Sequence, residues 1–264
     1  MAASLIEMID FVWKSPKPPP GTKRRVLDRT LPENFKYFRN WGFTIYRTYY
    51  GPESDEHWGT LLQVLTQQTR LALGYHAIDE VREDDKRWGF RPHNDVDAYL
   101  DKIEIMKNLF RLFPREDPNL LTGLDIAGIR KLCLEEAEQA ESEKNMVGTC
   151  LNFVLVADEK VLKDIANNNF VVKAVGYDWS PIQHAGSWGW IRLATDDLLQ
   201  LWEMLYIAYE LNISKYFELE FRGLEEDLER HVWFGAGSLP PLGDCSRVQT
   251  ACEDGKSGRF KFDP

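Results

Sequence analysis

The sequence predicts an α+β domain with a mostly antiparallel sheet and helices packed on one face. Four short segments have the β-branched and aromatic composition of strands, and they span 43–50, 150–157, 170–177 and 190–193. Two longer segments, 58–73 and 198–209, repeat apolar residues at the spacing of an amphipathic helix. The β-α-β-β-α order of these segments also fits a ferredoxin-like arrangement.

The first strand and the helix after it have recognisable ends. Gly51 and Pro52 terminate the strand 43–50, and Ser54 then offers an N-cap hydroxyl to the helix. From Trp58 onward the apolar residues recur on one side, which is therefore expected to pack on the sheet. Residues 79–92 are charged and contain a proline, so they are expected to form a loop.

The later segments follow the same logic. The strand 150–157 has little polar character on either face, which is typical of a central strand. Asp158 can cap a short helix behind it, and three asparagines at 167–169 favour a turn. Beyond the helix 198–209, the pattern predicts a strand over 215–221 and a helix over 224–233.

Composition shifts divide the chain into three parts. Residues 1–40 form an N-terminal segment with a basic, proline-rich tether, and 41–234 form the single α+β domain. Within that domain, 94–143 contains two helical patterns and is expected to be a helical insertion. Residues 235–264 are rich in Gly, Pro and charge, and are expected to form an irregular or disordered tail.

Composition indicates a soluble, acidic, cytoplasmic protein. The chain has 264 residues, 44% of them hydrophobic, and a net charge of −10, which argues against nucleic-acid binding. No stretch is apolar enough to span a bilayer, and the start lacks the basic region of a signal peptide. The four cysteines agree with a reducing compartment. The basic tether 14–32 is either a solvated linker, a nuclear-import signal or a ligand for a proline-binding domain.

Sequence motifs with known chemistry are missing. The chain has no G-x-S-x-G, H-E-x-x-H or C-x-x-C motif, and its five histidines lack metal-ligand spacing. The short Gly-rich stretches near the end do not lead from a strand into a helix, as a phosphate loop would. We therefore expect no metal and no cofactor, and the motifs leave open whether the protein is an enzyme.

The loop 177–190 is the strongest candidate for a functional site. It combines a carboxylate, an imidazole, hydroxyls and three indoles, the mixture of apolar walls and a few polar groups that ligand sites use. Asp178 could orient His184 as a general base, whereas Trp188 and Trp190, two residues apart, would share one side of their strand. The alternative, which we favour, is a structured hairpin that only covers the core.

A second candidate lies in the first strand. Arg47 interrupts an aromatic run beside Tyr46, and its guanidinium could bind an anionic ligand. If the first and fourth strands were close, both residues could join Trp188 and Trp190 in one ligand site. The favoured alternative is an ion pair between Arg47 and a carboxylate on the exposed face of the sheet.

Four runs of residues resemble a family of filamentous-fungal (ascomycete) proteins to which no activity is assigned. They are the run 41–50 followed by Trp58, the stretch from Asp117-Pro118 to Ile129-Arg130, the strand 153–159, and 189–193. The resemblance covers most of residues 41–210. It implies a fungal source and a single intact domain, and it assigns no site residues.

Two classes of function follow from the sequence. The first is a non-catalytic protein that binds a partner protein or a small ligand, and the lack of any catalytic motif favours it. The second is an enzyme with a site around Asp178 and His184 that acts on a small molecule, in fungal specialised metabolism if the resemblance holds. Both side chains pointing into a shared apolar cleft would favour the enzyme.

Overall fold

The computed structural model describes residues 5–14, 16, 20–21, 27–29, 31–87, 96–139, 151–184, 186–216, 219–221 and 223–233. For 75–87, 96–100 and 137–139 only the helical backbone is described. The predictions for the tail 235–264 and for most of the tether 14–32 lie outside these residues.

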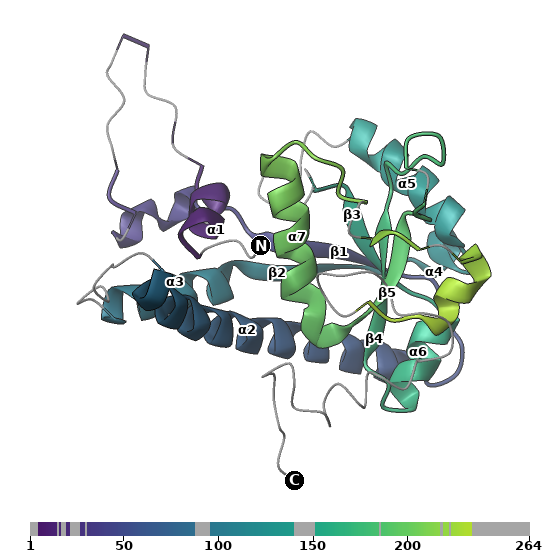
Figure 1. Ribbon diagram of the computed structural model, residues 1–264. Coiled ribbons are helices and arrows are strands. Elements are labelled where there is room, and N and C mark those ends of the chain that lie inside the picture. Colours follow the sequence, from purple (N-terminus) through teal and green to yellow (C-terminus); the bar gives the residue numbers. More distant parts are fainter. Residues whose placement is uncertain are drawn as a thin grey trace.

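A five-stranded mixed sheet forms the centre of the protein (Figure 1). Its strands lie in the order β2-β1-β3-β4-β5, with the bounds β1 (Trp41–Arg47), β2 (Phe110–Arg115), β3 (Phe153–Ala157), β4 (Val171–Gly176) and β5 (Trp190–Ala194). β1 pairs in parallel with β2 and β3, whereas β3–β4 and β4–β5 are antiparallel. The α+β class is confirmed.

Two details of the sheet differ from the sequence prediction. Only the β3-β4-β5 half is antiparallel, and the ferredoxin-like arrangement is not confirmed. The reason is the long connections between β1, β2 and β3. They contain helices, and parallel pairing requires such crossovers because a short hairpin cannot join parallel strands.

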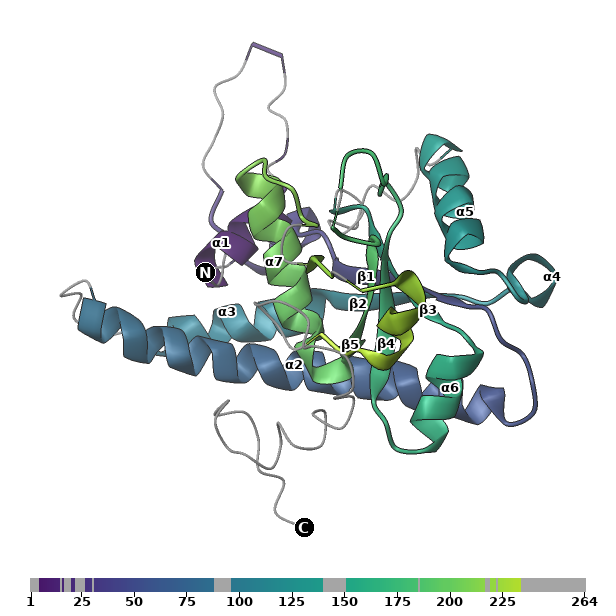
Figure 2. The same cartoon turned by 45° about the vertical axis from the view of Figure 1, so that its right-hand side comes forward.

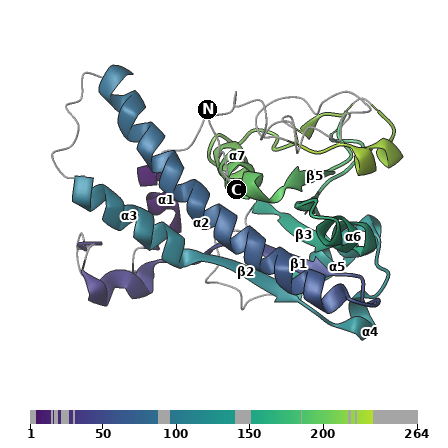
Figure 3. The same cartoon turned by 90° about the horizontal axis from the view of Figure 1, so that it is seen from below.

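Helices α2 (Ser54–Arg87) and α7 (Leu198–Glu210) pack on the same face of the sheet, as predicted (Figure 3). Leu61 of α2 and Leu201 of α7 are both fully buried. Trp41 of β1 lies on this face with its ring centroid 4.9 Å from that of Trp202 in α7. The expected loop at 79–92 is wrong for residues 79–87, which continue α2, because charged side chains favour an exposed helix as readily as a loop.

Helical elements also cover the opposite face, which differs from the one-sided cover that the sequence predicted. Helix α5 (Ile126–Gln139) lies on this side, and the 3₁₀ helix η5 (Glu225–Arg230) covers β5 (Figure 2). The hydroxyl of Tyr46 in β1 donates to Glu136 of α5 at 2.8 Å. The cause lies in the strands, because every residue of β3 and β4 is buried and both of their faces need a cover.

The N-terminal segment contributes to the core. In α1 (Leu5–Val12), Leu5, Met8 and Val12 are buried within the main hydrophobic cluster. The core therefore reaches beyond the start at Trp41 that the sequence indicated.

The segment 94–143, expected as a helical insertion, supplies an edge strand to the sheet. It contains α3 (Val96–Leu109), β2, α4 (Pro118–Leu121) and α5. β2 pairs with β1 in register from Trp41↔Phe110 to Tyr46↔Arg115. The elements not yet named are η1 (Pro32–Tyr37), α6 (Glu159–Ala166) and η3 (Thr195–Asp197). Among the described helices, none has both the length and the apolar character that a bilayer crossing needs.

Candidate functional site

The loop between β4 and β5 is held in place by an arginine from α5. Arg130 donates from Nε to the carbonyl of Gly176 at 3.1 Å and from Nη2 to the carbonyl of Trp188 at 2.7 Å. Its guanidinium carbon lies 4.4 Å from the centroid of the Trp179 ring, a cation–π contact. Arg130 thereby joins both ends of the loop to the helix below it.

Gly189 lets the loop fold over its own tryptophan. Its φ of +69° lies in the left-handed region, which side chains other than glycine rarely adopt. A Cβ atom at this position would lie 2.1 Å from Cγ of Trp179. A glycine is therefore required both for the backbone conformation and for the close contact with the indole.

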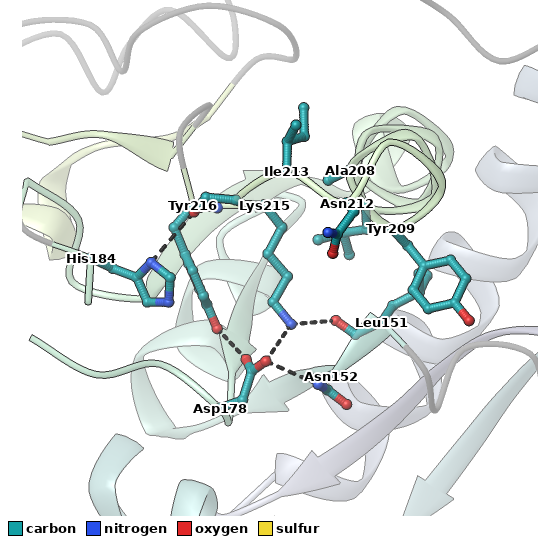
Figure 4. Close-up of a pocket in the computed structure, with 12 residues that line it drawn as sticks. Leu151, Asn152, Asp178, His184, Ala208, Tyr209, Asn212, Ile213, Lys215 and Tyr216 are labelled. Carbon is teal, nitrogen blue, oxygen red and sulfur yellow. Dashed lines mark hydrogen bonds and ion pairs between the residues drawn. The ribbon is translucent and has the colours of Figure 1, made fainter. Parts of the chain in front are cut away.

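The first half of the loop borders a cavity of about 370 Å³, which we call the Asp178 pocket. Asp178 and His184 both line it, so the structure brings the two candidate catalytic residues to one hollow (Figure 4). The remaining lining residues come from the start of β3 and from the end of α7 with the turn after it: Leu151, Asn152, Leu205, Ala208, Tyr209, Asn212, Ile213, Ser214, Lys215 and Tyr216.

The carboxylate of Asp178 accepts hydrogen bonds from three side chains. Nζ of Lys215 lies 2.8 Å from Oδ2, Nδ2 of Asn152 lies 2.9 Å from the same oxygen, and the hydroxyl of Tyr216 lies 2.5 Å from Oδ1. Burial pushes the pKa of Asp178 upward, but the bonds from Lys215, Tyr216 and Asn152 outweigh it and leave the pKa below the usual value. Asp178 is therefore a fixed anion and a poor proton acceptor.

Tyr216 reaches Asp178 because the chain reverses after α7 and because Gly176 leaves room. Asn212, with φ at 51°, follows the C-cap of α7 and turns the chain back toward the sheet. A Cβ atom on Gly176 would lie 2.2 Å from the hydroxyl oxygen of Tyr216. Burial, followed by the bond to Asp178, raises the pKa of Tyr216, so its hydroxyl remains a donor at neutral pH.

His184 does not pair with Asp178. Its Nδ1 lies 3.4 Å from the hydroxyl of Ser214, and its ring centroid lies 4.4 Å from that of Tyr216. Figure 4 shows the phenol of Tyr216 between the imidazole and the carboxylate. The predicted arrangement, in which Asp178 orients His184 as a base, is replaced by a network centred on Lys215 and Tyr216.

The second half of the loop borders another hollow of about 510 Å³, which we call the tryptophan groove. Its lining residues are Trp188, Trp190, Leu224, Glu225, Glu226 and Glu229. Both indoles line it, as their spacing predicts, and both donate their Nε1 protons. Trp190 donates to Oε1 of Glu225 at 2.8 Å, and Trp188 donates to the carbonyl of Gly223 at 3.1 Å.

Arg47 and Tyr46 lie away from both hollows. Arg47 is 4% exposed and pairs with Asp55 and, at 3.5 Å, with Glu116, so the favoured ion pair forms. The arginine of this pair is buried, whereas both carboxylates are exposed. Tyr46 points to the opposite face and bonds Glu136. β3 and β4 separate β1 from β5, so neither residue approaches the two indoles of the groove.

Several residues that shape the two hollows were not identified from the sequence. Lys215 and Tyr216 lie where the sequence predicted a strand, and the described part of 215–221 contains turns instead. Glu225 and Glu226 begin η5, inside the predicted helix 224–233. Charged residues at a turn carry no local signal of a partner that is about 37 positions away, as Asp178 is from Lys215.

Comparison with known proteins identifies no relative. No protein-family model, no curated protein and no solved structure matches the chain. Across the described residues, no group of three or more His, Cys, Asp or Glu side chains could hold a metal ion. Function is therefore argued from the geometry of the two hollows.

Proposed function

We propose that this protein is a non-catalytic, cytoplasmic binding protein that holds a small amphipathic molecule in the Asp178 pocket. The observation that carries the proposal is the saturation of Asp178 by Lys215, Tyr216 and Asn152. These bonds keep the carboxylate ionised and engaged, so it can fix the polar floor of the pocket but is poorly suited to move a proton. The polar side chains of the pocket are therefore arranged to orient a ligand rather than to catalyse a reaction.

The lining supports a ligand with one apolar and one polar end. Leu205 and Ala208 of α7 provide buried apolar wall, and Ile213 extends it at the rim, where it is more than half exposed. The polar side is formed by side chains such as Asn212 and Ser214. A volume of about 370 Å³ lies at the lower end of the range for small-molecule sites, about 300–1,000 Å³.

The experiment uses 1-anilinonaphthalene-8-sulfonate as the probe, because it has an apolar body and an anionic end. We expect saturable fluorescence enhancement by the folded protein and its loss in Ala208→Phe, whose larger side chain fills the pocket. Leu211→Ala is the matched control, since Leu211 is exposed beside the pocket but does not line it. Equal binding by the wild type and Ala208→Phe would contradict the proposal.

A second candidate function rests on the contact between His184 and Ser214. Their separation of 3.4 Å is slightly long for a base and a nucleophile, and such pairs tighten when a substrate binds. In this alternative, His184 accepts the proton of the Ser214 hydroxyl as the serine oxygen bonds to the acyl carbon of an ester. The ester bond to the leaving group then breaks, and water hydrolyses the acyl-serine to regenerate the enzyme. Hydrolysis of p-nitrophenyl acetate that disappears in Ser214→Ala would favour this enzymatic function. If the wild type gives no turnover above the rate in buffer, the result favours the binding function instead.

A further inference from the structure

We propose that the tryptophan groove is a second binding site, and that it takes the N–H-bearing cationic group of an organic amine or guanidine. This site is separate from the Asp178 pocket, and the two share no lining residue. The proposal rests on the indoles that line the groove, on the exposed carboxylates of Glu225 and Glu226, and on a cation that the protein itself holds against Trp190.

The groove joins indole surface to carboxylates with spare acceptor capacity. Indoles attract cations through the negative face of the ring, and carboxylates add Coulomb attraction. Glu225 accepts a neutral hydrogen bond from the Trp190 indole and forms no ion pair with the described residues, although the Arg130 guanidinium is close enough to attract it electrostatically. Glu226 is exposed, and no hydrogen bond or ion pair joins it to the part of the chain that the structure describes. The groove is therefore suited to a positive group and unsuited to an anion.

The acceptors in the wall of the groove determine whether a ligand needs N–H donors. Oε1 of Glu229 pairs with Lys173, but Oε2 is buried and has no hydrogen-bond partner among the described residues. A buried carboxylate oxygen without a donor is costly, and native proteins usually supply one. This oxygen is shielded from solvent, so a ligand in the groove meets the exposed carboxylates of Glu225 and Glu226 instead. An ammonium or guanidinium group can donate N–H bonds to these carboxylates, whereas a quaternary ammonium group cannot.

The protein itself shows this chemistry on Trp190. The ammonium of Lys173 lies 5.1 Å from the centroid of the Trp190 ring and pairs with Glu229 and, at 2.6 Å, with Asp158. Lys173 is buried and does not line the groove. The indole and the carboxylate thus already hold one ammonium inside the protein. The groove offers groups of the same kind to a cation from solution, through the half-buried indole of Trp188 and the exposed carboxylates of Glu225 and Glu226.

The test titrates the full-length protein with agmatine, which carries an ammonium and a guanidinium group, and follows tryptophan fluorescence and calorimetric heat. We expect saturable binding that weakens at least tenfold in Glu226→Gln and in Trp188→Leu. Glu56→Gln is the matched control, because it removes one exposed carboxylate from α2, far along the chain from the groove. Glu226→Gln changes an exposed side chain and is expected to fold normally, so the test does not depend on the Trp188 variant.

Two further arms define the ligand. Tetramethylammonium is expected to bind at least tenfold more weakly than agmatine, because it has no N–H to donate to the exposed carboxylates of the groove. N-acetyl-arginine amide presents the same guanidinium on a peptide unit: tighter binding than agmatine identifies a peptide as the source of the cation, and weaker binding identifies a free amine. No saturable binding of agmatine, equal loss in Glu56→Gln, or equal binding of tetramethylammonium would overturn the proposal.

Discussion

The Asp178 pocket and the tryptophan groove are built by the same loop but differ in how their charges are compensated. In the pocket, the carboxylate of Asp178 meets an ammonium and two further donors from the protein itself. In the groove, Glu225 and Glu226 are exposed and form no ion pair with the described residues, and one buried oxygen of Glu229 lacks a donor. From this difference we infer that the pocket selects its ligand by shape and polarity, whereas the groove selects its ligand by charge.

The largest expected effect is a loss of stability when Trp190 is removed from the wall of the groove. Trp190 is 4% exposed, and its ring covers the ammonium of Lys173. Trp190→Ala is therefore expected to lower the free energy of unfolding by about 3–5 kcal/mol, as for other buried Trp-to-Ala changes. Urea unfolding measures this change. Trp188 is only half-buried, so Trp188→Ala should cost clearly less, and an equal cost would show that both indoles are mainly core.

The second-largest expected effect is a loss of stability when the charge of Asp178 is removed from the pocket. Asp178→Asn keeps the shape of the side chain but removes the carboxylate that pairs with the ammonium of Lys215. We expect a loss of about 2–3 kcal/mol, less than for a fully buried pair because the carboxylate is partly exposed to solvent. Glu159→Gln is the control, since its pair with Lys163 is exposed on both sides and should contribute less than about 1 kcal/mol. Similar losses in the two variants would show that the pair between Asp178 and Lys215 contributes no more to stability than an exposed ion pair does.

The same network predicts a dependence on pH. The fold lowers the pKa of Asp178 below its ordinary value of 3.8, so ionised Asp178 stabilises the folded state. This stabilisation is present above pH 3.8 and is lost as the pH falls through the lower pKa of the folded state. The difference in unfolding free energy between the wild type and Asp178→Asn should therefore stay constant near neutral pH and shrink only below about pH 4. A difference that shrinks between pH 7 and 5 would mean that the pKa is not lowered.

Local patterns were sufficient for most elements of the fold. The apolar spacing around Leu61 and Leu201 correctly placed both helices against the sheet, and the uninterrupted apolar character of 153–157 correctly indicated a central strand. The partners of the strands were harder to predict. β2 contains Arg111, Pro114 and Arg115, and its strand character depends on pairing with β1 rather than on its own residues.

The candidate site was predictable only as a loop. Its mixture of indoles and polar groups identified 177–190, and the spacing of Trp188 and Trp190 placed both in one hollow. The sequence could not show that Lys215 and Tyr216 would occupy the carboxylate of Asp178, because the turn after α7 brings them there from a distant part of the chain. Nor could it show that η5 would add its carboxylates to the groove.

The smallest expected effect separates binding from catalysis in the Asp178 pocket. His184 is half-exposed and makes one long bond to Ser214 and one ring contact with Tyr216. His184→Ala is therefore expected to change the unfolding free energy by less than about 1 kcal/mol, in contrast to Asp178→Asn. If the pocket only binds, this variant should keep most of its affinity for 1-anilinonaphthalene-8-sulfonate, because the apolar wall formed by α7 is intact. If His184 is instead the base for Ser214, esterase turnover should fall by about 10²–10⁴-fold while probe binding persists. Measuring both properties on one preparation assigns the role of His184 directly, since a loss of turnover without a loss of affinity or stability is expected only of a catalytic group.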